Sequence, residues 1–90
     1  MTTKRKPTLP EAMEAYAAAN NVSMRELIAK GRTLELVKKR QAAFVYAKSQ
    51  TGKTLAQIGA AFGGRHRTTI AHGIRRSEER AKAALAQSRA

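Results

Sequence analysis

Capping boxes mark the starts of helices along this chain, and they constrain its fold more than any other feature. A Ser or Thr followed three residues later by Glu or Gln occurs at Thr8, Ser23 and Thr54, each time before apolar residues at helical spacing. In such a box, the two side chains satisfy backbone N–H groups that the first turn of a helix leaves unpaired. No stretch shows the alternation of apolar and polar residues that is typical of a strand. The sequence therefore predicts an all-α fold.

Helical spacing and glycine stops predict about five helices in one compact domain. Ninety residues with 42% apolar content are enough for one modest core and too few for two domains. We expect residues 35–51 to form the longest helix, ended by Gly52, at the centre of the scaffold. A short helix opened by Ser23 is expected to end at Gly31. The remaining helices are expected over about residues 8–20, 54–62 and 66–86.

Apolar residues of the later helices supply the predicted core. Along the last expected helix, Ile70, Ile74, Ala81 and Leu85 fall on one side at helical spacing. The residues predicted at the centre of the core are Phe44, Ile58, Phe62 and Ile70.

The charge of the chain indicates a polyanionic partner. Eighteen Lys and Arg stand against six acidic residues, so the formal net charge is +12, far beyond what solubility requires. An anionic membrane surface would need a helix with large apolar residues opposite the charge, and no apolar run approaches the roughly 20 residues of a membrane span. We therefore expect nucleic acid as the partner, no membrane and no small-molecule substrate, and a cytoplasmic, nucleoid-associated location.

The chain also lacks residue types that other functions need. Cys and Asp are absent, which leaves His66 and His72 as the only soft metal ligands. No nucleophile–base pair or carboxylate pair of the kind used in catalysis is present. We therefore expect no metal site, no cofactor and no enzymatic activity.

The N-terminus differs in composition from the rest of the chain. Residues 1–7 carry three basic side chains and almost nothing apolar, so they cannot offset the entropy of ordering. We expect residues 1–7 to form a flexible basic arm and residues 8–90 to form the domain.

A glycine pair separates the last two expected helices. Gly63 and Gly64 allow backbone angles that other residues resist, and they let the turn approach phosphates closely. The helix that follows opens with polar and basic side chains, and its free N–H groups favour an anion. Two helices joined by a short glycine turn in this way form a helix-turn-helix, which presents its second helix to the major groove of DNA.

Side-chain chemistry gives the residues around this turn separate roles. The guanidinium of Arg67 pairs well with guanine, and the methyl group of Thr68 can pack on the methyl group of thymine. His66 stands at the same helix start and is expected to contact a base or a phosphate. Arg65 and Thr69 are placed to add phosphate contacts. These residues are the candidates for sequence recognition.

A second cluster of basic residues spans the region just before the expected long helix and its first turns. Residues 30–40 hold five basic residues against the single acid Glu35, namely Lys30, Arg32, Lys38, Lys39 and Arg40. We interpret this stretch as a basic loop that leads into the helix and adds to the DNA-binding face. A charged loop that serves only solubility is the alternative.

Residues 55–72, which read LAQIGAAFGGRHRTTIAH, resemble the signature of a known family. That family is the C-terminal DNA-binding domain of the bacterial replication initiator DnaA, whose core reads FGGRDHTT followed by a hydrophobic pair and His. Residues 12–31 resemble the first two helices of the domain, and residues 38–41 stand where the family carries its basic loop. The resemblance covers nearly the whole chain and implies a TrpR/DnaA domain IV-like helical fold.

The resemblance also implies a set of contacts with double-stranded DNA. It implies that Arg40 reaches into the minor groove beside the recognition site. His66, Arg67 and Thr68 are implied to read major-groove edges, with Thr69 beside them. The residues expected to contact the phosphate backbone are Lys38, Lys48, Thr54, Leu55, Arg65 and His72.

This chain departs from the family's pattern at the start of the recognition helix. Where the family has Asp then His, this chain has His66 then Arg67, and Lys39 stands where the family often has Pro. An acceptor-only carboxylate is thus replaced by an imidazole with a guanidinium beside it. We hypothesise that Arg67 favours guanine at a changed position, which weakens binding to the family's standard site by about 1 to 3 kcal/mol per altered contact.

Two features of the last helix have alternative interpretations. His72 is either a phosphate contact or a partly buried structural residue. The basic residues further along alternate with Glu78 and Glu79, and we interpret them as an ordinary solvated face. These basic residues are Arg75, Arg76, Arg80 and Lys82.

The expected function is sequence-specific binding of duplex DNA. Replication initiators carry a nucleotide-hydrolysing oligomerisation domain for which ninety residues leave no room, so we expect a stand-alone protein that does not open an origin by itself. We favour a transcriptional regulator, of phage-derived or gene-transfer-agent type. A replication modulator that competes for initiator sites, and a sequence-neutral architectural protein held by charge, are the alternatives. RNA polymerase or another regulator as a protein partner is left open.

Overall fold

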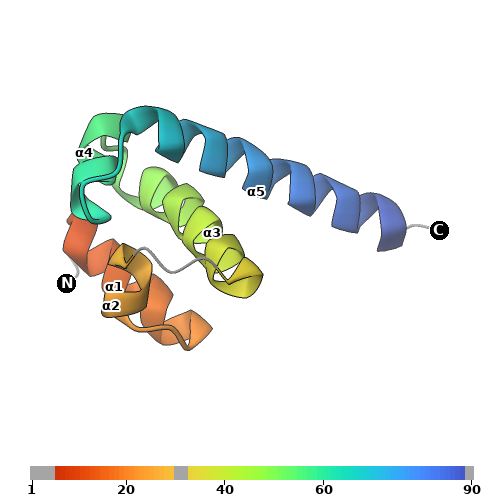
Figure 1. Ribbon diagram of the computed structural model, residues 1–90, viewed down its shortest axis with the longest axis horizontal. Coiled ribbons are helices and arrows are strands. Elements are labelled where there is room, and N and C mark those ends of the chain that lie inside the picture. The colour runs from red at the N-terminus through yellow and green to blue at the C-terminus, as the bar shows by residue number, and fades with distance from the viewer. Residues whose placement is uncertain (1–5, 30–32, 89–90) are drawn as a thin grey trace, which may run out of the picture.

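The fold is all-α, as the capping boxes predict. The computed structural model describes residues 6–29 and 33–88, and these form five helices and no strand. The helices surround one core, with α3 in the middle of the arrangement and α5 running along it (Figure 1). Their bounds are Leu9–Asn20 for α1, Met24–Ile28 for α2, Leu34–Thr51 for α3, Leu55–Ala61 for α4 and Arg67–Ser88 for α5.

The three predicted capping boxes form as expected. The Thr8 N–H donates to Oε1 of Glu11 at 2.9 Å, while Thr8 Oγ1 accepts from the Glu11 N–H at 3.3 Å. Ser23 and Thr54 make the same reciprocal bonds at the starts of α2 and α4. Helices α1, α2 and α4 therefore begin where the sequence predicts, because each start depends on side chains only three residues apart.

The predicted basic loop overlaps the predicted helix over residues 35–51, and the structure confirms the helix, so the loop is wrong. Thr33 caps α3 by accepting from the Leu36 N–H at 3.3 Å, so the helix begins ahead of the basic residues. Lys38, Lys39 and Arg40 consequently lie inside α3. No Pro interrupts the pattern there, so nothing stops the helix from including them.

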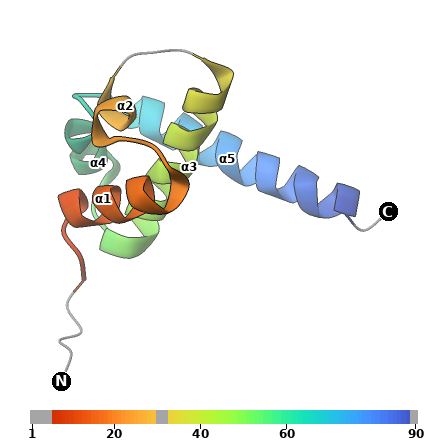
Figure 2. The ribbon, with the colours of Figure 1, turned by 90° about the horizontal axis from the view of Figure 1, so that it is seen from below.

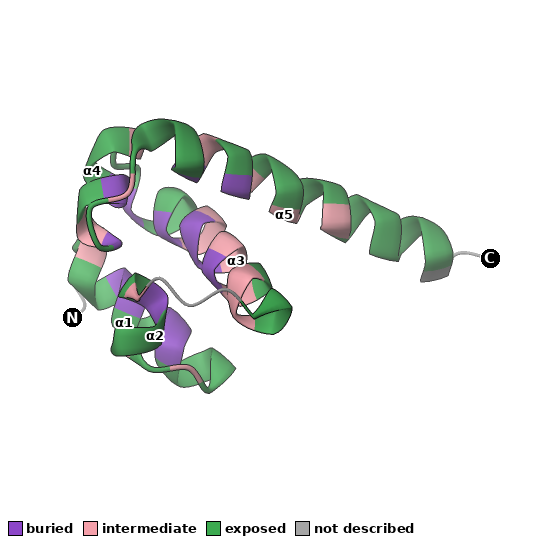
Figure 3. Ribbon diagram, viewed as in Figure 1, coloured by how far each residue is buried: buried purple, intermediate pink, exposed green. Residues whose placement is uncertain are grey.

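The ends of two other helices also differ from the prediction. α2 stops at Ile28, and Gly31, which was expected to end it, lies outside the described residues. The longest helix is α5, with 22 residues against 18 for α3. The C-terminal part of α5 extends beyond the other helices and is exposed (Figures 2 and 3). The apolar side predicted for this helix is therefore not covered at Leu85, which is 65% exposed.

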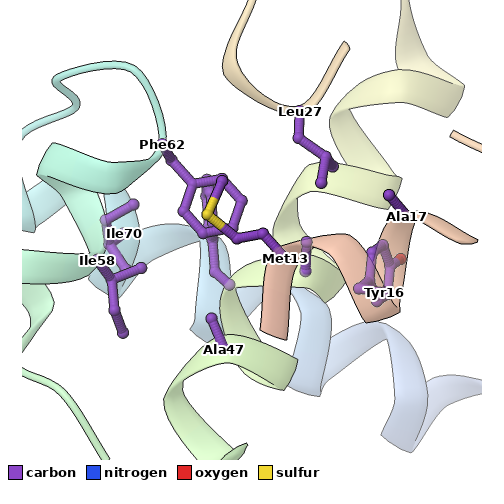
Figure 4. Close-up of a cluster of buried hydrophobic side chains, with 10 residues drawn as sticks. Met13, Tyr16, Ala17, Leu27, Ala47, Ile58, Phe62 and Ile70 are labelled. Atoms are coloured by element: carbon purple, nitrogen blue, oxygen red, sulfur yellow. The ribbon is translucent and has the colours of Figure 1, made fainter. Parts of the chain in front are cut away.

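The core forms around the predicted residues. Ile58, Phe62 and Ile70 are fully buried and Phe44 is nearly so, which confirms the prediction. Figure 4 shows Met13 of α1 in one buried cluster with Phe62, Ile58 of α4 and Ile70 of α5. The rings of Phe44 and Phe62 meet edge to face with centroids 4.9 Å apart. This packing joins the turn before α5 to the middle of α3.

The expected N-terminal arm lies mostly outside the described residues, which begin at an exposed Lys6. Within the described part of the chain, no helix is long and apolar enough to cross a membrane. The same residues contain no group of three His, Cys, Asp or Glu side chains that could hold a metal ion.

Candidate nucleic-acid interface

The turn between α4 and α5 is a tight backbone crossing. Gly63 and Gly64 have φ values of 83° and 77°, a region that side chains with a Cβ rarely adopt. The Arg65 N–H donates to the carbonyl oxygen of Gly59 at 2.8 Å, and a Cβ on Gly59 would lie 2.0 Å from the carbonyl oxygen of Arg65. The glycines thus let α4 and the start of α5 touch through their backbones, which fixes the angle between them.

The turn is also packed against α2. A Cβ on Gly63 would lie 2.5 Å from the carbonyl oxygen of Ile28. Beside it, Arg65 Nη1 donates to the carbonyl of Phe62 and lies 3.4 Å from that of Leu27. The helix-turn-helix is therefore held by α2, a segment distant in sequence, as well as by its own core.

The side chain of Arg65 donates hydrogen bonds to backbone carbonyls in this structure. Its Nη2 donates to the carbonyl of Ala29 at 2.7 Å, and Nη1 approaches that of Ile28 at 3.5 Å. Burial lowers the pKa of Arg65 from its ordinary value, and the positive charge of Arg40 lowers it further. A cation at the last carbonyls of a helix stabilises the helix end. The structure thus gives Arg65 a structural role, and its phosphate contact stays a prediction.

Arg40, which is expected to reach the minor groove, contacts α2 in this structure. It is 5% exposed, and its Nε donates to the carbonyl of Glu26 in α2 at 2.9 Å. Burial lowers the pKa of Arg40, and the carboxylate of Glu26 opposes this effect. In this structure the side chain of Arg40 packs against α2, and its minor-groove contact stays a prediction. The sequence pattern misses this because α2 and α3 meet only in the folded chain.

The residues that are expected to contact base edges lie together at the start of α5. His66, Arg67, Thr68 and Thr69 are all exposed there, while Ile70 is fully buried beneath them. His66 accepts at its carbonyl from the N–H groups of Thr69 and Ile70, at 3.0 and 3.3 Å, which begins the helix. Its Nδ1 accepts from the Thr68 N–H at 3.1 Å. The exposed first turn of α5 therefore presents polar side chains above the buried Ile70.

The expected phosphate-contacting residues at the start of α4 lie together. Thr54 is exposed and caps α4, with Leu55 half-buried next to it. Lys48, near the end of α3, is exposed and donates from Nζ to the carbonyl of Lys53 at 3.2 Å. Lys38 is exposed as well, but it lies near the other end of α3.

An open groove between α3 and α5 is lined by further basic side chains. His72 is exposed, which does not agree with the alternative of a partly buried structural residue. It shares this groove with Arg75, Arg76, Glu79 and the Gln41 side chain of α3. The sequence predicts a solvated face for these two arginines, and their spacing of three and four residues from His72 places them on its side of the helix.

Comparison with known proteins agrees with this geometry. Residues 11–76 match the family described as the bacterial dnaA protein helix-turn-helix. The chain belongs to this family. The match includes α4, the glycine turn and the first part of α5, so the turn described above is the family's helix-turn-helix. No solved structure matches the chain.

Curated relatives from this DnaA family are chromosomal replication initiator proteins. The chain is 41% identical over 71 residues to the protein of Bartonella quintana, which covers 79% of this chain and 14% of the relative. It is 39% identical over 75 residues to that of Cereibacter sphaeroides, covering 83% and 16%. With the protein of Oenococcus oeni it shares 40% identity over 73 residues, covering 81% and 16%. The chain thus spans about one seventh of the length of these relatives.

Proposed function

We propose that this chain binds double-stranded DNA sequence-specifically, with the start of α5 in the major groove. The observation that carries the proposal is the exposed group of His66, Arg67 and Thr68 at the first turn of α5. In helix-turn-helix proteins, the N-terminal residues of the second helix contact base edges. Membership in the DnaA helix-turn-helix family supports the same placement.

Contacts with the phosphate backbone supply the rest of the binding energy in this proposal. The net charge of +12 provides the attraction to a polyanion. Lys48 and Thr54, which lie near the start of α4, contact phosphates on one side of the major groove of the DNA. Leu55 lies beside them. The residues proposed to contact phosphates elsewhere are Lys38, His72, Arg75 and Arg76.

The proposed physiological role is transcriptional regulation on chromosomal DNA. The similarity to replication initiator proteins favours a second candidate, a modulator of replication that occupies initiator sites. A genome-wide occupancy map separates the two roles, because regulators collect at promoters and replication modulators at origins. Enrichment at origins alone would reject the regulatory role.

Sequence specificity is tested by selection from a pool of random duplexes, followed by binding measurements with the selected site and a scrambled site. We expect Arg67→Ala to lower affinity for the selected site by about 1 to 3 kcal/mol and to affect the scrambled site less. Lys82→Ala is the matched control, because it removes one exposed positive charge from α5 far from the turn. Equal losses on both sites for Arg67→Ala would indicate a sequence-neutral architectural protein.

A further inference from the structure

His66 is the residue that caps α5. An N-cap side chain accepts a hydrogen bond from an N–H two or three residues into the helix, and Ser, Thr, Asp and Asn usually fill this role. Here the Thr68 N–H donates to Nδ1 of the imidazole at 3.1 Å. The His66 carbonyl at the same time accepts the first helical bonds of α5.

This cap bond selects one form of the imidazole ring. A ring nitrogen that accepts a hydrogen bond carries no proton, and the neutral ring has a single N–H. With Nδ1 as the acceptor, the proton of His66 resides on Nε2. The ring is exposed, so the Nε2–H group is open to a ligand. The helix end therefore holds His66 as a hydrogen-bond donor.

We propose that His66 determines specificity by donating from Nε2 to a base in the major groove, and that it selects against cytosine there. This inference rests on the proposed function and specifies one of its contacts. In the major groove, guanine presents N7 and O6, adenine presents N7 and thymine presents O4 as acceptors. Cytosine presents only its amino group, which is a donor. A donor held at this position therefore matches three bases and opposes the fourth.

A carboxylate at position 66 would have the opposite hydrogen-bonding character. Asp also caps helices well, but both of its oxygens are acceptors when it is ionised. His66→Asp should therefore keep the start of α5 while turning the group that faces the base from a donor into an acceptor. His66→Asn keeps both properties of the histidine, because the amide oxygen can cap α5 and the amide nitrogen can donate.

The test is selection from a pool of random-sequence duplexes with wild type, H66D and H66N in parallel. At one position of the site, we expect H66D to raise the preference for cytosine over the wild-type base by about fivefold, as expected for one hydrogen bond. H66N should retain the wild-type preference. His72→Asp, further along α5, makes the same change of side chain and should lower affinity without altering the selected sequence.

The tautomer is measured separately by NMR of the ring nitrogens of the neutral His66 in the free protein. A proton on Nε2 supports the inference, and a proton on Nδ1 overturns it. A selective wild type whose site is identical to that of H66D also overturns the inference while leaving the proposed function intact. A wild type that selects no sequence overturns both.

Discussion

The guanidinium Nη2 of Arg65 donates to the carbonyl oxygen of Ala29, at the end of α2, over a distance of 2.7 Å. Arg40 reaches the same short helix from α3, where its Nε donates to the Glu26 carbonyl. An arginine of α3 and an arginine of the turn before α5 thus satisfy carbonyls that the last turn of α2 leaves without helical partners. The position of the helix-turn-helix relative to α1 and α2 depends on these contacts.

Replacing Arg65 should therefore lower stability. We expect Arg65→Met to reduce the free energy of unfolding by about 2 to 3 kcal/mol, because several carbonyls lose a charged donor. Urea unfolding followed by circular dichroism measures the change. Arg67→Met is the matched control, since Arg67 is exposed and surface substitutions usually change stability by less than about 0.5 kcal/mol. Equal stability of the two variants would contradict the structural role of Arg65.

The backbone crossing at Gly59 should tolerate no side chain. Gly59→Ala places a Cβ 2.0 Å from the Arg65 carbonyl oxygen, which forces α4 and α5 apart. We expect a loss of about 3 kcal/mol in the free energy of unfolding together with a loss of DNA binding. Gly64→Ala is the control, because a Cβ there meets open space and costs only the left-handed backbone strain, about 1 to 2 kcal/mol. A smaller effect at Gly59 than at Gly64 would argue against the crossing.

Alanine substitutions in two capping boxes distinguish an effect on stability from an effect on DNA binding. Thr8→Ala and Thr54→Ala each remove an N-cap and should each lower the free energy of unfolding by about 1 kcal/mol. Only Thr54 lies on the proposed DNA-binding face, so only Thr54→Ala should also weaken binding to the selected duplex. Fluorescence anisotropy under conditions where both variants are folded measures the difference. Equal affinities would remove Thr54 from the interface.

The groove that contains His72 should contribute to salt dependence. We expect Arg76→Ala to reduce the slope of log affinity against log salt concentration by about 1, because one phosphate contact is lost. Lys82→Ala, also exposed on α5, should leave the slope unchanged. Titrations of the selected duplex at several salt concentrations give both slopes. An unchanged slope for Arg76→Ala would restrict the interface to the turn and the start of α4.

The sequence predicted some features well because their causes are local. The start of α4 depends on Thr54 and Gln57, and the turn depends on Gly63 and Gly64, all of which are visible in a few letters. The predicted basic loop at Lys38 to Arg40 is wrong although the cause here is local too. Charge density alone does not reveal whether a segment is helical, and the cap at Thr33 begins α3 ahead of these residues.

The sequence by itself determined the starts of α1, α2 and α4, because the capping bonds that form them join residues three positions apart, and it determined the glycine turn, because Gly63 and Gly64 adopt positive φ values. Only the tertiary structure decided which basic residues face solvent. The residues that Arg40 and Arg65 contact in α2 lie 14 and 36 positions away along the chain. No local pattern distinguishes the buried Arg40 and the partly buried Arg65 from the exposed Arg67, because their burial depends on where α2 packs.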